Sequence, residues 1–397
     1  MSDTLLAQRV RQMAPSITLA ITAKAKALKA AGVDVIGFGA GEPDFDTPGF
    51  IKEEVGAALG RGETKYTPVP AAMGLREAIS AKFKEQNGLD YPATQISVAA
   101  GGKHMLYVAM QALLDPGDEV VVLAPYWVSY PEQAKLAGGR VVEIRGDEAD
   151  SFKVTPAQLE AALTAKTKIV VLNSPSNPAG HGYTADEQAA LGAVIAKFPR
   201  IVVFSDEIYE HLIYDGFEHV SFAKACPDLF DRTVTFNCHS KSFSMTGWRV
   251  GYAGGPAEII KACNGLISQM TSHITSFIQS AAALALTDPR GMEAVAEMRE
   301  SFVRRRALMH RLLNALPGVT CVEPQGAFYC FPNIAAHLGD KYPTAVEFAA
   351  ALLDEAHVAV VPGNDSGFDT HVRLSFATSD ENIERGIERV GKWLGKK

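Results

Sequence analysis

One lysine in the middle of the chain stands among hydroxyl side chains and precedes an arginine by eight residues. The run from Asn237 to Arg249 reads N-C-H-S-K-S-F-S-M-T-G-W-R, with the lysine at Lys241. A lysine amine becomes a nucleophile when its surroundings lower its pKa, and the planar fork of an arginine suits a phosphate. A phosphorylated aldehyde bound to lysine requires both groups, and pyridoxal phosphate (PLP) is such a molecule. The alternative is a pair of solvated surface cations, because exposed lysine is the norm.

Glycines elsewhere in the chain would let backbone approach a ligand closely. Gly37, Gly39 and Gly41 form a G-x-G-x-G pattern, but Glu-Pro-Asp follows it in place of a helix. This argues against a dinucleotide site and leaves a close backbone contact or a plain turn. Gly101, Gly102 and Lys103 lead into a helix predicted over 104–114. The N-terminus of a helix presents free N–H groups to an anion. The first glycine of an ATP-binding loop is missing there.

Short apolar runs alternate with helical stretches around these residues. The alternation predicts an α/β fold with a mainly parallel sheet. We expect strands at 95–100, 119–123, 141–144, 169–172, 201–204 and 233–236, and helices at 74–86, 128–137, 156–163 and 185–197.

The chemically distinctive side chains fall directly after the predicted strands. Trp127, Asn177, Asp206 and Lys241 each follow a different strand. Ligands of parallel sheets lie beyond the carboxyl ends of the strands, so these four side chains are expected to meet. Each also has a structural alternative: core packing for Trp127, an Asn-Pro turn for Asn177, and a helix N-cap for Asp206.

Both ends of the chain differ in character from its middle. We expect a helix over 15–31 and a strand at 33–38, and a long helical region over 254–315 that breaks near 288–289. Short strands at 326–332, 358–361 and 371–376 with helices at 344–355 and 380–394 predict a smaller α+β domain. The expected division is 1–45 as an N-terminal segment of the small domain, 46–305 as a large PLP-binding domain, and 306–397 as the small C-terminal domain.

The composition bounds the class of protein. The 397 residues are 47% hydrophobic with a net charge of −7, which argues against nucleic acid or anionic membrane as the main partner. Five cysteines without a C-x-x-C pattern indicate neither a disulfide framework nor a zinc site. No signal peptide and no membrane span is indicated, so a reducing cytoplasm is the expected location.

Six motifs in order along the chain resemble those of class I aminotransferases of PLP fold type I. The chain looks most like the bacterial aspartate aminotransferases of the group that also contains prephenate aminotransferases, over nearly its full length. The motifs are K-Y-T-P at 65–68, P-Y-W at 125–127, S-N-P at 176–178, S-D-E-I-Y at 205–209, the run around Lys241, and the strand with Arg373. The resemblance implies a large domain with a mostly parallel seven-stranded sheet between helices.

The resemblance also implies roles at the cofactor ring. Lys241 would bind the PLP aldehyde and, once released by substrate, move a proton between the substrate Cα and the cofactor. Asp206 would pair with the pyridine nitrogen, and Trp127 would stack on the ring. Tyr209 and Asn177 would hydrogen-bond the ring oxygen, although a half-buried tyrosine in a purely structural role is the alternative for Tyr209.

The cofactor phosphate would lie at the glycine-rich helix start. Tyr66 would reach the phosphate of the neighbouring subunit, which makes the enzyme a homodimer with shared sites. The resemblance also implies cis peptides at Ala124-Pro125 and Asn177-Pro178. The remaining cofactor contacts would come from Gly101, Gly102, Lys103, Ser240 and Arg249.

Substrate recognition follows from the same resemblance. Arg373 would take the α-carboxylate in a bidentate pair, with Gly41 contacting the substrate through its backbone and Trp127 and Asn177 lining the site; a surface strand residue is the alternative for Arg373. No arginine lies in 266–285, where one branch of aspartate aminotransferases supplies one. The distal carboxylate would instead meet Lys103, Ser16 and Thr18, which suits aspartate or glutamate.

Four positions depart from the family pattern. They are Ala14, Cys238, His239 and the segment 270–273, which ends in His273. His239 and His273 either tune the second carboxylate site or only pack. The leading hypothesis is a ping-pong transaminase that converts aspartate and 2-oxoglutarate to oxaloacetate and glutamate. Alternatives are a prephenate, aromatic or alanine aminotransferase, a PLP-dependent C–S lyase or synthase, and a non-enzymic binding relative. The last would be expected to lack Lys241 or Asp206, and both are present.

Overall fold

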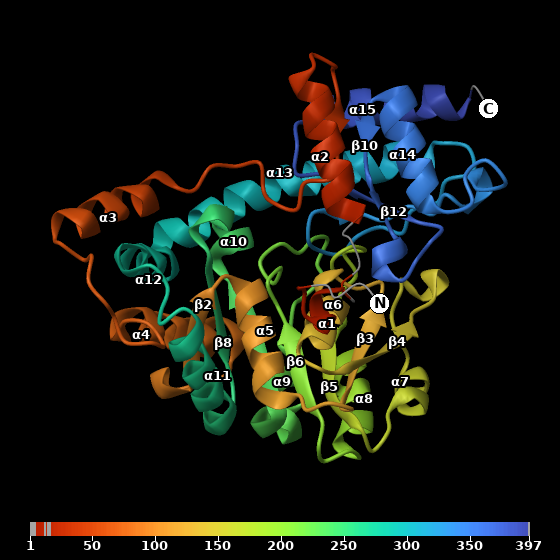
Figure 1. Ribbon diagram of the computed structural model, residues 1–397. Coiled ribbons are helices and arrows are strands. Elements are labelled where there is room, and N and C mark those ends of the chain that lie inside the picture. The colour runs from red at the N-terminus through yellow and green to blue at the C-terminus, as the bar shows by residue number, and fades with distance from the viewer. Residues whose placement is uncertain (1–4, 12, 14–16, 396–397) are drawn as a thin grey trace.

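The computed structural model describes residues 5–11, 13 and 17–395 of the chain. Figure 1 shows a larger part built on a central sheet and a smaller part that contains both the red N-terminal helix α2 and the blue C-terminal helices. The predicted helix start at 15–16 and the Ala14 departure lie outside the described residues.

A seven-stranded sheet forms the centre of the larger part, in the order β2-β8-β7-β6-β5-β3-β4. All neighbours are parallel except β8, which runs antiparallel to both β2 and β7, so the prediction of a mostly parallel seven-stranded sheet is confirmed. The strands are β2 (Ile96–Ala100), β3 (Glu119–Ala124), β4 (Arg140–Arg145), β5 (Thr167–Asn173), β6 (Val202–Asp206), β7 (Thr233–Cys238) and β8 (Val250–Gly254).

The sheet is apolar on both faces because helices cover both. Along β3, Val120 and Val122 pack into the core beneath α5, α6 and α11, whereas Val121 packs into the core beneath α7 and α8. This is the period of two that a strand buried on both sides requires. The helices of this part are α5 (Gly102–Leu113), α6 (Ser129–Leu136), α7 (Pro156–Ala162), α8 (Ala185–Ala196), α9 (Phe222–Ala225), α10 (His239–Ser242) and α11 (Ala257–Met270).

A group of helices extends this part past the edge strand β2. Here α12 packs against α3 and α4. The helix predicted over 74–86 is α-helical only as far as Lys82, and the chain then continues as a π-helix over Phe83–Asn87. The helices are α3 (Gly49–Gly60), α4 (Met73–Lys82) and α12 (Gln279–Thr287).

The smaller part joins the two ends of the chain. Strand β1 (Ile36–Gly37) pairs in parallel with β10 (Val358–Ala359), while β11 (Val361–Pro362), β12 (Val372–Ser375) and β9 (Tyr329–Cys330) form an antiparallel sheet. The predicted single strand 358–361 is therefore two short strands with different partners, and those at 33–38 and 326–332 are shorter than predicted.

Helices enclose the core of the smaller part. In α15 (Asp380–Leu394), Ile383, Ile387, Val390 and Leu394 recur at helical spacing and are buried, and the Ser379 side chain accepts a bond from the backbone N–H of Asn382. The other helices of this part are α2 (Ile17–Ala30), α13 (Pro289–Asn314) and α14 (Ala345–Ala356), whereas the short α1 (Gln8–Arg11) is drawn over the larger part in Figure 1.

Helix α13 bears on the predicted domain boundary. It is one continuous helix of 26 residues and passes through position 305 without a break, so any division there crosses a helix rather than a linker. The long helical region breaks at 288, as predicted, and also at 271–278, which the sequence did not indicate. None of the helices within the described residues is long and apolar enough to cross a membrane.

Candidate active site

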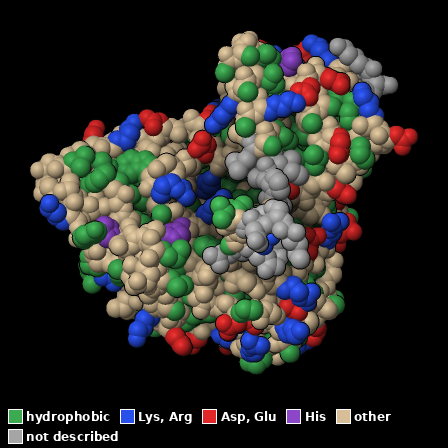
Figure 2. Space-filling model, in the orientation of Figure 1, with side chains coloured by type: hydrophobic (Ala, Val, Ile, Leu, Met, Phe, Trp, Pro, Cys, Tyr) green, Lys and Arg blue, Asp and Glu red, His purple; other side chains and the backbone are tan. Residues whose placement is uncertain are grey.

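A cleft of about 740 Å³ opens at the carboxyl ends of the parallel strands and reaches the smaller part. A neighbouring cavity of about 350 Å³ shares Lys241, Asp206 and Trp127 with it. Figure 2 shows the hollow between the two parts, with lysine and arginine side chains in its wall. Within the described residues, these two cavities contain the predicted Gly41, Gly102, Lys103, Trp127, Asn177, Asp206, Tyr209, Ser240, Lys241, Arg249 and Arg373.

Lys241 lies on the short helix α10, immediately after β7. Its ammonium donates a hydrogen bond to the carbonyl of Gly41 and lies 5.6 Å from the ring centre of Phe328. The partner carbonyl comes from the loop after β1, so the third glycine of G-x-G-x-G does bring backbone to the site. The amine thus faces the cleft from the larger part and is held by the N-terminal segment.

Asp206 is completely buried at the end of β6, at the floor of the cleft. The Tyr130 hydroxyl donates to its Oδ2 at 2.5 Å, while its Oδ1 has only a long contact of 3.4 Å from the Ile208 N–H. Burial raises the pKa of Asp206 to about 6, and the Tyr130 hydrogen bond opposes this rise. No helix begins at this position, so the N-cap alternative is wrong.

The start of α5 forms a cradle with Arg249. Gly101 has φ +88, and a Cβ on it would lie 2.2 Å from the Arg249 guanidinium, so only glycine fits there. Arg249 donates to the carbonyls of Thr246 at 2.8 Å and Ala100 at 3.4 Å. Gly101 is the N-cap of the 12-residue helix α5, whose first N–H groups have no partner within the helix and no side-chain cap. A guanidinium and a helix N-terminus together suit a phosphate.

Arg373 enters the cleft from β12 in the smaller part. It is only 9% exposed, which excludes the surface alternative. Its Nη1 donates to Asn177 Oδ1 at 3.0 Å and its Nη2 to the Gly39 carbonyl at 3.1 Å, while its buried Nε has no partner within the described residues. The guanidinium also lies 4.5 Å from the ring centre of Tyr329. Arg373 therefore has donor capacity left for a carboxylate.

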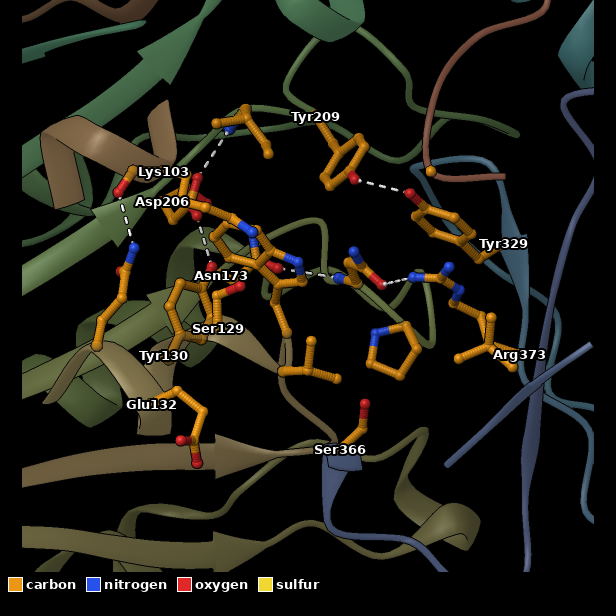
Figure 3. A pocket seen from close by; sticks show the side chains of 18 of the residues that line it. Lys103, Ser129, Tyr130, Glu132, Asn173, Asp206, Tyr209, Tyr329, Ser366 and Arg373 are labelled. Carbon is orange, nitrogen blue, oxygen red and sulfur yellow. Dashed lines mark hydrogen bonds between the residues drawn. The ribbon is translucent and has the colours of Figure 1, made fainter. Parts of the chain in front are cut away.

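Lys103 lies at the other side of the cleft from Arg373 in the view of Figure 3. Its ammonium lies 4.9 Å from the ring centre of Trp127, a cation–π distance. Desolvation lowers the pKa of Lys103, and the charges of Arg249 and Lys241 act in the same direction. Lys103, Lys241, Arg249 and Arg373 all line this cleft, and its several positive charges attract an anion with more than one negative group.

Two of the predicted site residues that the structure describes, Gly101 and Tyr66, line neither cavity. Tyr66 is 91% exposed, outside both cavities, with its ring edge-on to His273 at 5.5 Å. Ser16 and the side chain of Thr18 lie outside the described residues. Of the other departures, His239 is buried with Nε2 on the Ala282 carbonyl at 2.8 Å, and Cys238 lies against Gly102 at the cavity wall.

Three site residues were missed by the sequence reasoning. Tyr130 contacts Asp206, Asn173 donates to the Asp206 carbonyl at 2.9 Å and accepts from the Asn177 N–H at 2.9 Å, and the Tyr329 hydroxyl lies 3.1 Å from that of Tyr209. Figure 3 shows these contacts together. Only Asn173 carried a usable signal, because it directly follows the strand predicted at 169–172.

The cleft fits the predicted PLP on observations of its own residues. The Gly101–Arg249 cradle suits the phosphate, and the under-bonded Oδ1 of buried Asp206 suits a protonated ring nitrogen. Lys241 supplies the amine, and the unpartnered Nε of Arg373 remains for a carboxylate. The peptides Ala124-Pro125 and Asn177-Pro178 are cis, as predicted, and so is Ser174-Pro175.

Comparisons with known proteins agree with this geometry. The family model of class I and II aminotransferases matches residues 33–390. The chain is 52% identical to an aspartate aminotransferase of Geobacillus stearothermophilus, with 98% of each chain covered, and 48% identical to an aspartate/prephenate aminotransferase of Cereibacter sphaeroides, with 98% of this chain and 97% of that one covered. The crystal structure of the aspartate aminotransferase from Rhizobium meliloti superposes with a TM-score of 0.94 at 44% identity, over 98% of both chains.

Proposed function

The chain belongs to the class I and II aminotransferases, and from that premise we propose that it is a PLP-dependent aspartate aminotransferase. It moves the amino group of aspartate or glutamate to a 2-oxo acid such as 2-oxoglutarate, in two half-reactions of a ping-pong mechanism. The observation that carries this proposal is that Lys241, Arg373 and Lys103 line one cleft, because a reactive amine and two separate cations suit a dicarboxylic amino acid.

PLP, when bound, accepts the electrons that the substrate Cα releases and carries the amino group between the two half-reactions. Lys241 would hold the cofactor through its aldehyde, and its free amine would accept the proton of the substrate Cα. Gly41 holds this amine at the cleft through its carbonyl. Asp206 supplies the negative charge that keeps a proton on the ring nitrogen, and Tyr130 orients that carboxylate.

Other side chains orient the cofactor. Arg249, with the Gly101–Lys103 helix start and Ser240, would hold the phosphate, and Trp127 would pack against the ring; Gly102, Lys103, Trp127, Ser240 and Arg249 line the smaller cavity. Asn177 and Tyr209 would donate to the ring oxygen. Because Asn177 also accepts from Arg373, the ring contact and the substrate contact share one side chain.

The substrate is held at both ends. Arg373 binds the α-carboxylate, since its guanidinium is already fixed by Asn177 and Gly39 and has donor capacity left. Lys103 binds the distal carboxylate, and Ser16 and Thr18 are proposed to assist it. These contacts favour aspartate and glutamate over alanine or an aromatic amino acid.

We also propose that the enzyme is a homodimer with shared sites. Tyr66 lies outside its own cleft and is almost fully exposed, which supports a role at the phosphate of the partner's cofactor. The proposed location is the cytoplasm, where all five cysteines, free and buried, would remain reduced. The proposed division is into 1–45, 46–305 and 306–397. The pairing of β1 with β10 supports the assignment of 1–45 to the smaller part, whereas the boundary at 305 lies within helix α13.

Steady-state kinetics with aspartate and 2-oxoglutarate test the proposed activity. Double-reciprocal plots are expected to be parallel, since the first product leaves before the second substrate binds. The Lys241→Ala variant is expected to bind PLP and to lose turnover. Intersecting lines, or release of pyruvate and ammonia from a β-substituted amino acid as the main reaction, would contradict the proposal and favour the lyase alternative.

A further inference from the structure

A π-helical turn lies behind the active site, on the side away from the cleft. Helix α4 ends in the π-turn Phe83–Asn87, and Gly88 with φ 68 closes it. Helical widening of this kind is rare and occurs often beside functional sites. The turn brings Lys82, Gln86 and Asn87 against the segment that follows Asp206.

The first contact of this π-turn is a buried ion pair. The Lys82 ammonium donates to Glu210, and both side chains are at most 4% exposed. Asn87 Nδ2 donates to the other Glu210 oxygen at 2.6 Å. Asn237 Nδ2 donates to Glu210 at 2.5 Å and to the Glu207 carbonyl at 3.2 Å. Asn237 precedes Lys241 by four residues, so the pair ties the segment after Asp206 to the segment before Lys241.

The second contact is a chain of three side chains. His211 Nε2 lies 3.0 Å from Gln86 Oε1, and His211 Nδ1 lies 2.9 Å from Ser242 Oγ. Because Gln86 Oε1 only accepts, His211 donates through Nε2 and accepts the Ser242 hydroxyl at Nδ1. Desolvation lowers the pKa of His211 to about 4, so the ring is neutral at pH 7 and keeps this arrangement. Ser242 is the residue after Lys241 on α10.

A metal site is the competing interpretation of this region. Ligand atoms of Glu207, Glu210 and His219 lie within 4.8 Å of one another. The Glu210 oxygens, however, already accept hydrogen bonds from Lys82, Asn87 and Asn237. The Glu207 oxygens are bonded to the side chains of Ser205, Ser221 and His219. The Lys82 ammonium supplies the positive charge that a metal ion would bring.

We infer that the π-turn is a positioning device for the reaction, and that its Gln86–His211–Ser242 chain sets where α10 places the Lys241 amine relative to Asp206. This rests on the proposed function and deepens it. The Lys82–Glu210 ion pair holds the π-turn in place against the segment after Asp206. The His211 chain is the only described hydrogen-bonded link from the π-turn to α10 itself. His211, Gln86 and Ser242 are positioning residues, since none of them lines either cavity of the active site.

Positioning matters here because the same amine must reach both the cofactor aldehyde and the substrate Cα. A misplacement of about 1 Å costs on the order of a hundredfold in rate. The helix α10 is only four residues long and has no side-chain cap at its start, so its own hydrogen bonds do little to fix it. At the start of α10 the His239 side chain bonds the Ala282 carbonyl, and at its last residue Ser242 bonds His211. The Ser242 tether is therefore the side-chain bond of α10 that lies next to Lys241.

The test compares His211→Leu and Ser242→Ala with the wild-type holoenzyme. The maximal rate of the aspartate half-reaction is expected to fall about tenfold, with the apparent Kd for aspartate within about twofold, because Arg373 and Lys103 are untouched. The midpoint of the pH-dependent absorbance of PLP bound at Lys241 is expected to move by about half a pH unit without any substrate. The double variant is expected to match the worse single variant, because both remove the same chain.

His310→Leu is the matched control, since His310 is a part-buried histidine that bonds the Cys321 carbonyl at 3.0 Å far from α10. The inference is overturned if the rate and the absorbance midpoint of both test variants equal those of His310→Leu. Ser242→Ala removes only one oxygen atom, so its rate and absorbance midpoint test the inference by themselves if His211→Leu does not fold. A wild-type enzyme that transaminates nothing would refute the proposed function, whereas the substrate-free absorbance midpoint would still test the inference.

Discussion

The hydroxyl of Tyr130 lies 2.5 Å from Oδ2 of Asp206, at the buried floor of the cleft. Tyr130 comes from α6 and Asp206 from the end of β6, so the contact joins two elements that are 76 residues apart. The hydrogen bond stabilises the charged carboxylate against the burial that raises its pKa to about 6. This contact therefore increases the fraction of Asp206 that is anionic near neutral pH.

Replacing Tyr130 with phenylalanine is therefore expected to raise the pKa of Asp206 further. The acidic limb of the pH dependence of the aspartate half-reaction should move upward by about one pH unit. Tyr91→Phe is the control, because Tyr91 is an equally buried tyrosine that bonds Thr235 and lies outside the cleft. An acidic limb that stays in place in Tyr130→Phe would show that Tyr130 does not tune Asp206.

Replacing Lys103 with methionine tests the second carboxylate site. The variant keeps the length and most of the apolar surface of the side chain but removes the charge. We expect kcat/KM for aspartate to fall about a hundredfold and that for alanine to stay within about threefold, since only aspartate loses a charged hydrogen bond. Lys135→Met, which removes an exposed lysine paired with Glu132, serves as the control. Equal losses for both amino acids would contradict the assignment.

The Arg373→Lys variant tests whether Arg373 binds the α-carboxylate of the substrate. A lysine cannot bond Asn177, Gly39 and a carboxylate in one plane as the guanidinium does. The apparent Kd for aspartate is expected to rise about thirtyfold, which corresponds to about 2 kcal/mol. Arg385→Lys, at an exposed arginine that bonds Asp34, should leave the Kd unchanged. A Kd in Arg373→Lys like that of the control would exclude this role.

Shared active sites can be tested by mixing two inactive variants. In a dimer of one Tyr66→Ala protomer and one Lys241→Ala protomer, one site contains Lys241 and receives Tyr66 from the other protomer. If the subunits mix at random, activity should recover to about a quarter of the wild-type value. Mixing without recovery, while gel filtration confirms exchange, would show that Tyr66 acts in its own subunit.

The buried His239 is expected to make the fold sensitive to acid. Desolvation lowers its folded-state pKa to about 4, below the ordinary value of 6.5. Its contribution to stability is therefore complete above pH 6.5 and disappears as the pH falls toward 4. Between pH 8 and pH 5 the free energy of unfolding should fall by about 2 kcal/mol more in the wild type than in His239→Gln.

Equilibrium urea unfolding at the two pH values measures this difference. His310→Gln is the control, because His310 is a histidine of the smaller part whose side chain is 25% exposed. The prediction fails if wild type and His239→Gln lose the same stability on acidification. Success would also indicate that His239 packs in the core rather than tuning the second carboxylate site.

The sequence predicted the sheet well because its strands carry local information. Runs such as Val120–Val122 are apolar, β-branched and bounded by turn residues, so they predict buried strands without knowledge of their partners. Trp127, Asn177, Asp206 and Lys241 were predicted as a cluster for the same reason: the ends of parallel strands meet at one edge. The structure brings all four to one cleft.

The features that were missed depend on partners distant in the chain. Nothing near Tyr130 or Tyr329 in sequence indicates that their hydroxyls meet Asp206 and Tyr209, which are 76 and 120 residues away. The π-turn after α4 was also missed, because the pattern over 74–86 is that of an ordinary helix. Its widened turn is accompanied by tertiary contacts such as that of Lys82 with Glu210, and these are invisible to local periodicity.

The central claim is that this cleft exchanges an amino group between aspartate and a cofactor bound at Lys241. The most direct measurement mixes the PLP-loaded enzyme with one amino acid at a time, without any 2-oxo acid, and follows the cofactor absorbance in a stopped-flow instrument. Aspartate and glutamate are predicted to convert the cofactor to its amine form faster than alanine, phenylalanine or arogenate. No conversion with any of them, or faster conversion with alanine or phenylalanine than with aspartate, would contradict the account.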